Sequence, residues 1–334
     1  MTAVFFGEVM LRLSPPGREL LLQTPKFEVN VGGAEANVAT GLACLGHKVR
    51  MVTAVADNPL GAAVIGELRR RGVDTSTIAS EAGRLGLYFL TPGAGLRASE
   101  VVYDRAHSVF ATRAADSWDW DAVLEGATRL HLSGITPALG PNSAAAAIAA
   151  AEAAAARGVP VSFDGNYRAK LWEAWDSDPK TVLTQLIGHA DILFGNHRDV
   201  SLLLGKTFSG DGADRRREAA EAAFAAFPKL QVIASTARHV VDADSHRVAA
   251  RVDLRSGGHQ TDEVTIAGIV DRLGAGDAFA AGVLHGLSQG GDAVAAANAG
   301  LALTALKHSL PGDASLFGQA DIDAFLEGEL DVRR

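Results

Sequence analysis

Residues 271–279 combine glycines with aspartates and could bind a phosphate group and accept a proton. They read Asp-Arg-Leu-Gly-Ala-Gly-Asp-Ala-Phe and lie between a β-rich stretch, 264–270, and a run of small residues typical of a helix, 278–286. Glycines let the backbone approach a ligand closely, and the free N–H groups at a helix start attract phosphate. Asp277 has two interpretations: it caps the helix N-terminus, or it is a general base for an incoming hydroxyl.

A second glycine-rich segment leads into a helix near the start of the chain. Residues 31–39 read Val-Gly-Gly-Ala-Glu-Ala-Asn-Val-Ala, and Leu42 and Leu45 follow at the spacing of a buried helix face. Taken alone, this segment fits a close-packed helix start as well as it fits a ligand site, so both interpretations stay open.

Strands and helices that could position these motifs alternate along the chain. A strand at 130–132, an Ala-rich helix at 143–157 and a strand at 159–163 form one βαβ unit, whose helix Asn142 or Ser143 could cap. Further strands are predicted at 192–194 and 231–234, and a helix over 277–287 follows the β-rich stretch that ends at Val270. We therefore predict an α/β fold with a mostly parallel central sheet and helices on both faces.

Two segments interrupt the alternation. In residues 84–112, Leu-Tyr-Phe-Leu (87–90) and Glu-Val-Val-Tyr (100–103) flank a turn-rich Pro-Gly-Ala-Gly, and residues 10–31 also lack the βαβ pattern. Such runs are typical of antiparallel strands. We expect a small antiparallel β lid that projects from the main sheet and could also be a dimer surface.

Composition limits the classes of function. The 334 residues carry 31 Lys+Arg and 39 Asp+Glu, a formal net charge of −8, and 48% of them are hydrophobic. This is the composition of a globular protein with a sizeable core, and we predict one domain over residues 1–334. The chain has no basic region for nucleic acid, because the arginine triplets at 69–71 and 215–217 are interpreted as solvated helix faces.

The compartment is predicted from the cysteine count and from apolar runs. Cys44 is the only cysteine, so no internal disulfide can form, and its small-residue surroundings predict a buried, unreactive thiol. No apolar run is long enough to cross a membrane, and the N-terminus lacks the basic start of a signal peptide. We expect a cytoplasmic enzyme without a membrane partner.

Three other patterns are interpreted as structural. Gly-Lys-Thr at 205–207 ends like a nucleotide-binding P-loop, but Val200 stands where its first glycine belongs, so a helix C-terminus is expected. Residues 93–98 match a dinucleotide-binding glycine pattern, yet a strand follows, which predicts a hairpin turn. No histidines or cysteines stand at zinc-ligand spacing.

Together, the two glycine-rich motifs resemble the two signatures of the ribokinase-like (PfkB-type) carbohydrate kinases in order and separation. The likeness covers essentially the full length. Three more stretches resemble 2-keto-3-deoxygluconate kinases: Ser-Gly-Ile-Thr-Pro (133–137), Ser-Phe-Asp-Gly-Asn-Tyr-Arg (162–168) with Leu171-Trp172, and Lys-His-Ser-Leu-Pro-Gly-Asp (307–313). The resemblance implies a ribokinase-like fold and phosphorylation of 2-keto-3-deoxygluconate at its C6 hydroxyl. A kinase of fructose, ribose or another sugar, or a sensor without turnover, is the alternative.

The resemblance also implies the catalytic and substrate residues. Members use ATP with Mg²⁺, so Asp277 would take the hydroxyl proton while the amides of Gly274, Ala275 and Gly276 stabilise the transferring phosphoryl group. Arg105 and Arg168 would hold the carboxylate of a sugar acid, because a guanidinium matches a carboxylate in a bidentate way. The residues implied to bind the substrate are Gly33, Tyr88, Tyr103, Arg105, Arg168 and Asp277.

The nucleotide residues include a departure from the family pattern. A glycine loop should follow the strand at 231–234, but Ser-Thr-Ala-Arg-His stands there, and no glycine occurs between Gly212 and Gly257. Asp199 stands where the family has an acidic residue that organises Mg²⁺ through water, although an exposed loop acid is an equal alternative. The residues expected to bind the nucleotide are Asn166, Asn196, Thr236, Arg238, Gly274 and Gly276. Our hypothesis is that the side chains of Thr236 and Arg238 replace the backbone donors of the missing loop; an altered nucleotide preference or weaker ATP binding is the alternative. We expect a homo-oligomer formed through the lid.

Overall fold

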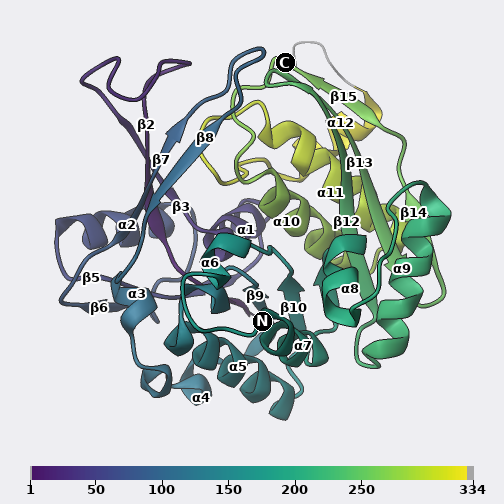
Figure 1. Cartoon of the computed structure of the whole chain (residues 1–334), viewed down its shortest axis with the longest axis horizontal. Coiled ribbons are helices and arrows are strands. Elements are labelled where there is room, and N and C mark those ends of the chain that lie inside the picture. Colours follow the sequence, from purple (N-terminus) through teal and green to yellow (C-terminus); the bar gives the residue numbers. More distant parts are fainter. Residues whose placement is uncertain (1, 329–334) are drawn as a thin grey trace.

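The computed structural model describes residues 2–328, and its largest element is a nine-stranded sheet (Figure 1). The strands are β1 Thr2–Phe6, β4 Val49–Val52, β9 Ala127–Ser133, β10 Val161–Asp164, β11 Ile192–Phe194, β12 Val232–Asp242, β13 Ser245–Leu254, β14 Gly257–Gln260 and β15 Val264–Ala267. Their order is β14-β13-β12-β11-β10-β9-β1-β4, with β15 also paired to β13. The strands from β12 to β4 are parallel, and β13 pairs antiparallel with β12, β14 and β15.

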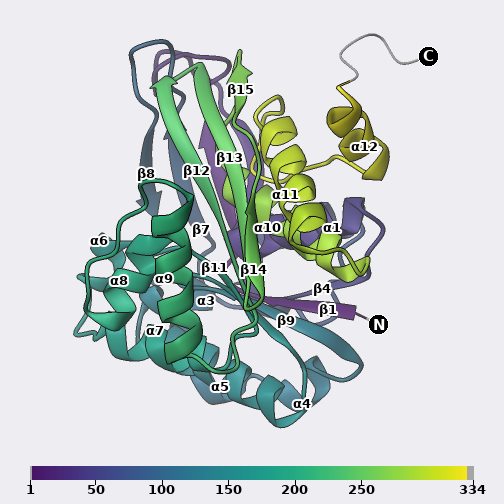
Figure 2. The same ribbon diagram turned by 90° about the vertical axis from the view of Figure 1, so that its right-hand side faces the viewer.

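Helices cover both faces of this sheet. Figure 2 shows one layer with α1 Ala34–Cys44, α10 Ala275–Ser288, α11 Ala293–Lys307 and α12 Gln319–Glu327, and an opposite layer with α4 Trp120–Val123, α5 Pro141–Ala156, α7 Pro179–Gly188, α8 His197–Leu204 and α9 Ala213–Ala226. The remaining helices are α2 Pro59–Arg70, α3 Val109–Thr112, α6 Ala169–Trp172 and two 3₁₀ turns, Ala115–Ser117 and Pro137–Leu139. The apolar parallel strands are buried between the layers, with Phe5, Leu130 and Phe163 fully enclosed. The predicted α/β fold is confirmed.

The predicted βαβ unit is present as β9, α5 and β10, and β9 pairs in parallel with β10. Its cap differs from the prediction, because Gly140 is the N-cap residue and makes no side-chain capping bond. Pro141 takes the first helical position, where its fixed φ angle fits and its missing N–H costs nothing. The side chain of Asn142 instead donates to the carbonyl of Thr112.

The strand predicted at 231–234 is longer than expected and leads into no helix. Strand β12 continues to Asp242 and pairs antiparallel with β13 along its length, from the pair Val232–Leu254 to the pair Asp242–Ser245. The residues that replace the family's glycine loop therefore lie on an extended strand. Without glycine, this segment has no residue suited to the left-handed conformations of a tight loop, and strand pairing satisfies its backbone instead.

The predicted lid is a second sheet of β2 Met10–Ser14, β3 Glu28–Gly32, β7 Gly86–Thr91 and β8 Glu100–Asp104. Its order is β3-β2-β7-β8, and Figure 1 shows it rising from one end of the large sheet. The two outer pairs are antiparallel, as predicted, while β2 and β7 in the middle, which belong to different hairpins, are parallel. Residues 93–98 connect β7 to β8, which confirms the predicted hairpin turn. A third sheet pairs β5 Ala54–Ala56 with β6 Ala79–Glu81.

Helix α8 ends at the predicted position. Gly205 follows its last residue and adopts the left-handed conformation that closes many helices. The interpretation of residues 205–207 as a helix C-terminus is confirmed.

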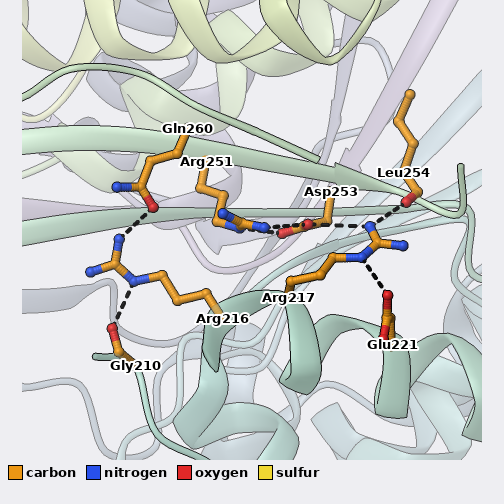
Figure 3. A network of polar contacts seen from close by, with 8 residues as sticks. All are labelled: Gly210, Arg216, Arg217, Glu221, Arg251, Asp253, Leu254 and Gln260. Atoms are coloured by element: carbon orange, nitrogen blue, oxygen red, sulfur yellow. Dashed lines mark hydrogen bonds and ion pairs between the residues drawn. The ribbon is translucent and has the colours of Figure 1, made fainter. Parts of the chain in front are cut away.

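Two of the three arginines at 215–217 are not part of a solvated helix face. Figure 3 shows that Arg216 and Arg217 point from α9 toward β13 and β14. Arg216 donates to the side chain of Gln260 at 2.7 Å, and Arg217 donates to the carbonyl of Leu254 at 2.7 Å and lies 3.3 Å from Asp253. These side chains bind α9 to the antiparallel edge of the large sheet.

Two findings bear on the predictions from composition. Cys44 is a free cysteine at the end of α1, and it is half-buried where a buried residue was predicted. Burial raises the pKa of its thiol, which makes the reactive thiolate scarce. Among residues 2–328, every helix is too short or too polar to cross a membrane.

Candidate active site

A cavity of about 930 Å³ lies where the carboxyl ends of the parallel strands meet the lid. The starts of α1, α8 and α10 border it, and β7, β8, β10 and β12 contribute side chains. It brings together all but one of the residues proposed from the sequence: Gly33, Tyr88, Tyr103, Asn166, Arg168, Asn196, Asp199, Thr236, Arg238, Gly274, Ala275, Gly276 and Asp277. The exception is Arg105.

The helix start at Gly274 has the geometry of an anion site. Gly274 is the N-cap residue of α10 and has a positive φ of 74°, a conformation that favours glycine. A Cβ atom at this position would also collide with the carbonyl oxygen of Asp313. The first amides of a helix have no partner within it, so those of α10 can bind an anion in the cavity.

Asp277 lies three residues after the N-cap position of α10, so it does not cap this helix. It is the third helical residue, and Gly274 occupies the cap, so the N-cap interpretation is wrong. Its Oδ2 accepts a 2.7 Å hydrogen bond from the side-chain amide of Asn37. Burial raises the pKa of Asp277 to about 6, and the Asn37 bond and the charges of Arg168 and Lys307 oppose that rise. A carboxylate with such a pKa is suited to general-base work near neutral pH.

Two further carboxyl groups face the same cavity. Burial, followed by the charges of Asp277 and Asp199, raises the pKa of Asp164 to about 8. Burial also raises the pKa of Asp199, whose Oδ2 accepts from the backbone N–H of Asn196 at 2.7 Å. This bond completes a capping box at the start of α8, so Asp199 has a structural task in addition to any role with metal.

A buried ionic cluster joins the lid to the loops around Gly274. Arg12, on β2, lies 2.7 Å from Asp271 and 2.5 Å from Asp313, and all three side chains are nearly inaccessible. The hydroxyl of Tyr88, on β7, donates to the other oxygen of Asp313. Burial raises the pKa of Asp313 to about 6, and Arg12 opposes the rise. Asp313 and Tyr88 thus form part of the cavity wall on the lid side.

Arg105 does not reach this cavity, in contrast to the prediction that it joins Arg168 in a clamp. Its Nε and Nη2 donate to Oε2 of Glu8 at 2.8 and 2.5 Å, and only 6% of its side chain is exposed. Glu8 also accepts from the hydroxyl of Ser108. Because a buried carboxylate needs a partner, Glu8 holds the Arg105 guanidinium below the lid.

Arg168, by contrast, is exposed at the cavity, and among residues 2–328 no acidic side chain lies at salt-bridge distance from it. It immediately precedes α6, and its charge acts on the carboxylates of Asp164, Asp199 and Asp277. An exposed guanidinium without a bound carboxylate is available for an acidic ligand.

A second cavity of about 650 Å³ adjoins the first. The two share Asn196, Thr236, Arg238 and Gly276 in their walls. Arg216, Arg251 and Asp253, three of the side chains drawn in Figure 3, line its far side. Because the shared wall includes the start of α10, a ligand in the second cavity can extend its anionic end toward Asp277.

The wall residues that were not predicted as site residues from the sequence include Asn37, Asp164 and Asp313. Asn37 stands inside the first glycine-rich motif, and Asp164 directly follows a predicted strand at the carboxyl edge of the sheet, so both positions could have been recognised. Asp313 ends the stretch 307–313 that resembles 2-keto-3-deoxygluconate kinases, but its contact with Arg12, about 300 residues earlier, could not be predicted from that stretch. Within residues 2–328, no group of three or more histidine, cysteine, aspartate or glutamate side chains is placed to hold a metal ion.

Comparisons with known proteins agree with this geometry. The family model described as pfkB family carbohydrate kinase matches residues 2–316. The chain is 31% identical to a 2-dehydro-3-deoxygalactonokinase of Haloferax volcanii over 98% of both chains, and 29% identical to a 2-dehydro-3-deoxygluconokinase of Bacillus subtilis over 94% of this chain and 91% of that one. The crystal structure of a 2-dehydro-3-deoxygluconokinase from Thermotoga maritima superposes with a TM-score of 0.93, at 38% identity, over 98% of this chain and all of the other. The chain therefore belongs to the pfkB family of carbohydrate kinases.

Proposed function

We propose that the protein phosphorylates 2-keto-3-deoxygluconate at its C6 hydroxyl with ATP, giving the 6-phospho sugar acid. The observation that carries the proposal is the common cavity of Asp277, the first amides of α10 and the free guanidinium of Arg168. A base and an anion site serve phosphoryl transfer to an alcohol, and a guanidinium at the same cavity selects an acidic sugar. Relatives named as kinases of 2-dehydro-3-deoxy sugar acids support this choice of substrate.

The proposed reaction places each group in one role. Asp277 accepts the proton of the C6 hydroxyl, whose oxygen attacks the γ-phosphorus as the bond to the leaving nucleotide breaks. The amides of Gly274, Ala275 and Gly276 donate to the oxygens of the transferring group. Arg168 holds the carboxylate of the substrate. Gly33, Tyr88 and Tyr103 line the part of the cavity that receives the sugar.

For the nucleotide we propose the second cavity, with its phosphates extending toward α10. Asn196, Thr236 and Arg238 lie on the wall that the cavities share, and Asn166 lies in the wall of the first cavity. Because no glycine loop follows β12, the side chains of Thr236 and Arg238 would donate some of the hydrogen bonds to phosphate that backbone N–H groups of such a loop would donate.

The residues present fit Mg²⁺ bound together with nucleotide. Mg²⁺ takes oxygen ligands, often one or two carboxylates in addition to substrate phosphates. Asp164 and Asp199 line the cavity and could hold the ion in this way, Asp199 through water. When bound, the ion would neutralise charge on the phosphates.

A kinase of the C4 epimer, 2-keto-3-deoxygalactonate, is the second candidate, since the Haloferax volcanii relative carries that name. An assay of ADP release with ATP and Mg²⁺ tests both, using the two epimers, fructose and ribose as acceptors. The highest kcat/KM with 2-keto-3-deoxygluconate supports the proposal, a preference for its epimer supports the second candidate, and a preference for a neutral sugar contradicts both. A protein that binds the sugar acid by calorimetry without releasing ADP would be a sensor.

We further propose that the chain acts as one catalytic domain and pairs with a second copy through its lid. The match of the family model to residues 2–316 supports the first point. Residues 1 and 329–334 of the predicted domain lie outside the described residues.

The lid carries exposed apolar side chains, with Leu22 83%, Val29 58% and Val102 49% exposed, which supports the pairing of two copies through the lid. Light scattering of wild type and Val102→Asp would test the pairing. A cytoplasmic location remains a prediction from the sequence.

A further inference from the structure

Lys307 is a fully buried lysine behind the anion site. It is the last residue of α11 and has 0% exposure, which is rare for an ammonium group because its desolvation is costly. Its Nζ donates to the backbone carbonyl of Leu310 at 3.0 Å and to that of Asp271 at 3.3 Å. One ammonium therefore connects the loop that leads into α10 to the loop that follows α11.

These two loops must stay in register for the anion site to exist. Gly274 lies so close to the backbone of Asp313 that no Cβ atom fits between them, and the amide of Gly312 donates to Asp271 at 3.1 Å. Helix α11 also holds α10 directly, since Thr304 donates to the carbonyl of Ala275 at 3.1 Å. A shift of either loop would therefore redirect the first amides of α10.

We propose that Lys307 is a positioning residue for phosphoryl transfer, whose buried positive charge holds the two loops together and adds to the field of the α10 amides. The proposal rests on the function assigned above to Asp277 and α10. Lys307 does not line the cavity, so it would act through the loop and through its charge rather than by touching the substrate.

The charges around Lys307 agree with an ammonium in the active form. Asp271 and Asp277 favour the charged state, while burial and the guanidinium of Arg12 oppose it, and the balance lowers the pKa of Lys307 to about 8. The charge of Lys307 in turn lowers the pKa values of Asp277 and of its neighbour His308.

The test compares Lys307→Ala, which leaves space, with Lys307→Met, which keeps volume without charge. Lys229→Ala is the matched control, because Lys229 also donates to a backbone carbonyl, that of His189 at 2.8 Å, at the opposite end of the sheet. We expect both Lys307 variants to lower kcat about 10- to 100-fold with little change in KM, since a misplacement of about 1 Å can cost about 10²-fold in rate. Lys229→Ala should retain the wild-type kcat.

Rescue of Lys307→Ala by small amines distinguishes the loss of positive charge from the loss of packing. Ammonium or methylammonium chloride should restore kcat of Lys307→Ala by about 10-fold, because a small cation can again bridge the two carbonyls, while tetramethylammonium chloride cannot enter. The proposal is overturned if folded Lys307→Met retains full kcat, or if no small amine restores Lys307→Ala.

If neither Lys307 variant folds, the pH dependence of kcat of the wild-type enzyme tests the proposal. Its kcat should fall between pH 7 and pH 10 as the ammonium loses its proton, and a flat profile over that range overturns the proposal. Failure of the proposed function is recognised separately, because wild type would then release no ADP with any of the sugar acids.

Discussion

The side-chain amide of Asn37 donates a 2.7 Å hydrogen bond to Oδ2 of Asp277, across two helix starts that are 240 residues apart in the sequence. Small residues allow this approach. A Cβ atom at Gly41 would lie only 3.0 Å from that of Ala281, so α1 and α10 pack with almost no space between them. The two glycine-rich motifs are therefore parts of one site, and the first orients the acid of the second.

Replacement of Asn37 by Ala should shift the acid limb of the pH–rate profile to higher pH. The Asn37 bond favours the ionised form of Asp277, so its loss raises the pKa of Asp277 further above about 6, and less base is available at pH 6. Rates at pH 8 should change much less. Asn142→Ala is the control, since Asn142 makes a comparable bond remote from the cavity. An unchanged acid limb in Asn37→Ala would contradict the role assigned to this contact.

Asp277→Asn should lower kcat by a factor of about 10² or more, because an amide cannot accept the hydroxyl proton. Binding of the sugar acid should weaken little, since Asn keeps the size of the side chain. Steady-state ADP release gives kcat, and calorimetry gives the binding constant. Near-wild-type turnover of this variant would remove Asp277 from the reaction.

The mostly parallel character of the large sheet and the grouping of most site residues were predictable from the sequence. Apolar runs followed by helix patterns placed β9, β10 and β11, and parallel pairing brings the ends of such strands to one edge. Glycines next to Asp277 indicated the anion site, because glycine lets the backbone at a helix start approach a ligand closely. These predictions depended only on local patterns and on one topological rule.

What could not be predicted depended on partners distant in the chain. The residues next to Arg105 in the sequence include no pattern that predicts its ion pair with Glu8, which lies 97 residues earlier. The cap of α5 was mistaken because Pro141 and Gly140 compete with Asn142 for the helix start. Strand β12 continues past Ala234 because the hydrogen bonds of its pairing with β13 favour an extended strand over the expected loop.

Glu35→Gln should change the dependence of stability on pH. Glu35 is 1% exposed and accepts bonds from Ser133 and Thr136, yet burial raises its pKa to about 7 from 4.5. The folded state therefore binds more protons than the unfolded state between these values, so the contribution of Glu35 to stability is lost as pH rises, by about 3 kcal/mol at most. Urea unfolding from pH 4.5 to 7.5 should show a smaller decline in the variant than in wild type. Parallel curves would contradict the assignment.

Arg12→Met should destabilise the fold by about 3–5 kcal/mol at pH 8, because it leaves the buried carboxylates of Asp271 and Asp313 without their cation. The loss should be smaller at pH 5. There Asp313, whose pKa lies near 6 even beside Arg12, is protonated and needs no counter-charge. Urea unfolding measures both values. Arg70→Met is the control, since Arg70 forms an exposed pair with Glu67, and its loss should change the free energy of unfolding far less than the loss of Arg12.

Arg168→Ala should raise KM for the sugar acid about 10- to 100-fold, because it removes the guanidinium that binds the carboxylate in the proposed complex. A larger effect is not expected, because an exposed contact is worth less than a buried one. KM for a neutral acceptor such as fructose, where it is used at all, should stay the same. Arg105→Lys separates the two arginines: it keeps the charge beside Glu8, so KM should remain near wild type even if stability falls. If instead Arg105→Lys raises KM for the acid while Arg168→Ala does not, the carboxylate lies below the lid and Glu8 must release Arg105 when substrate binds.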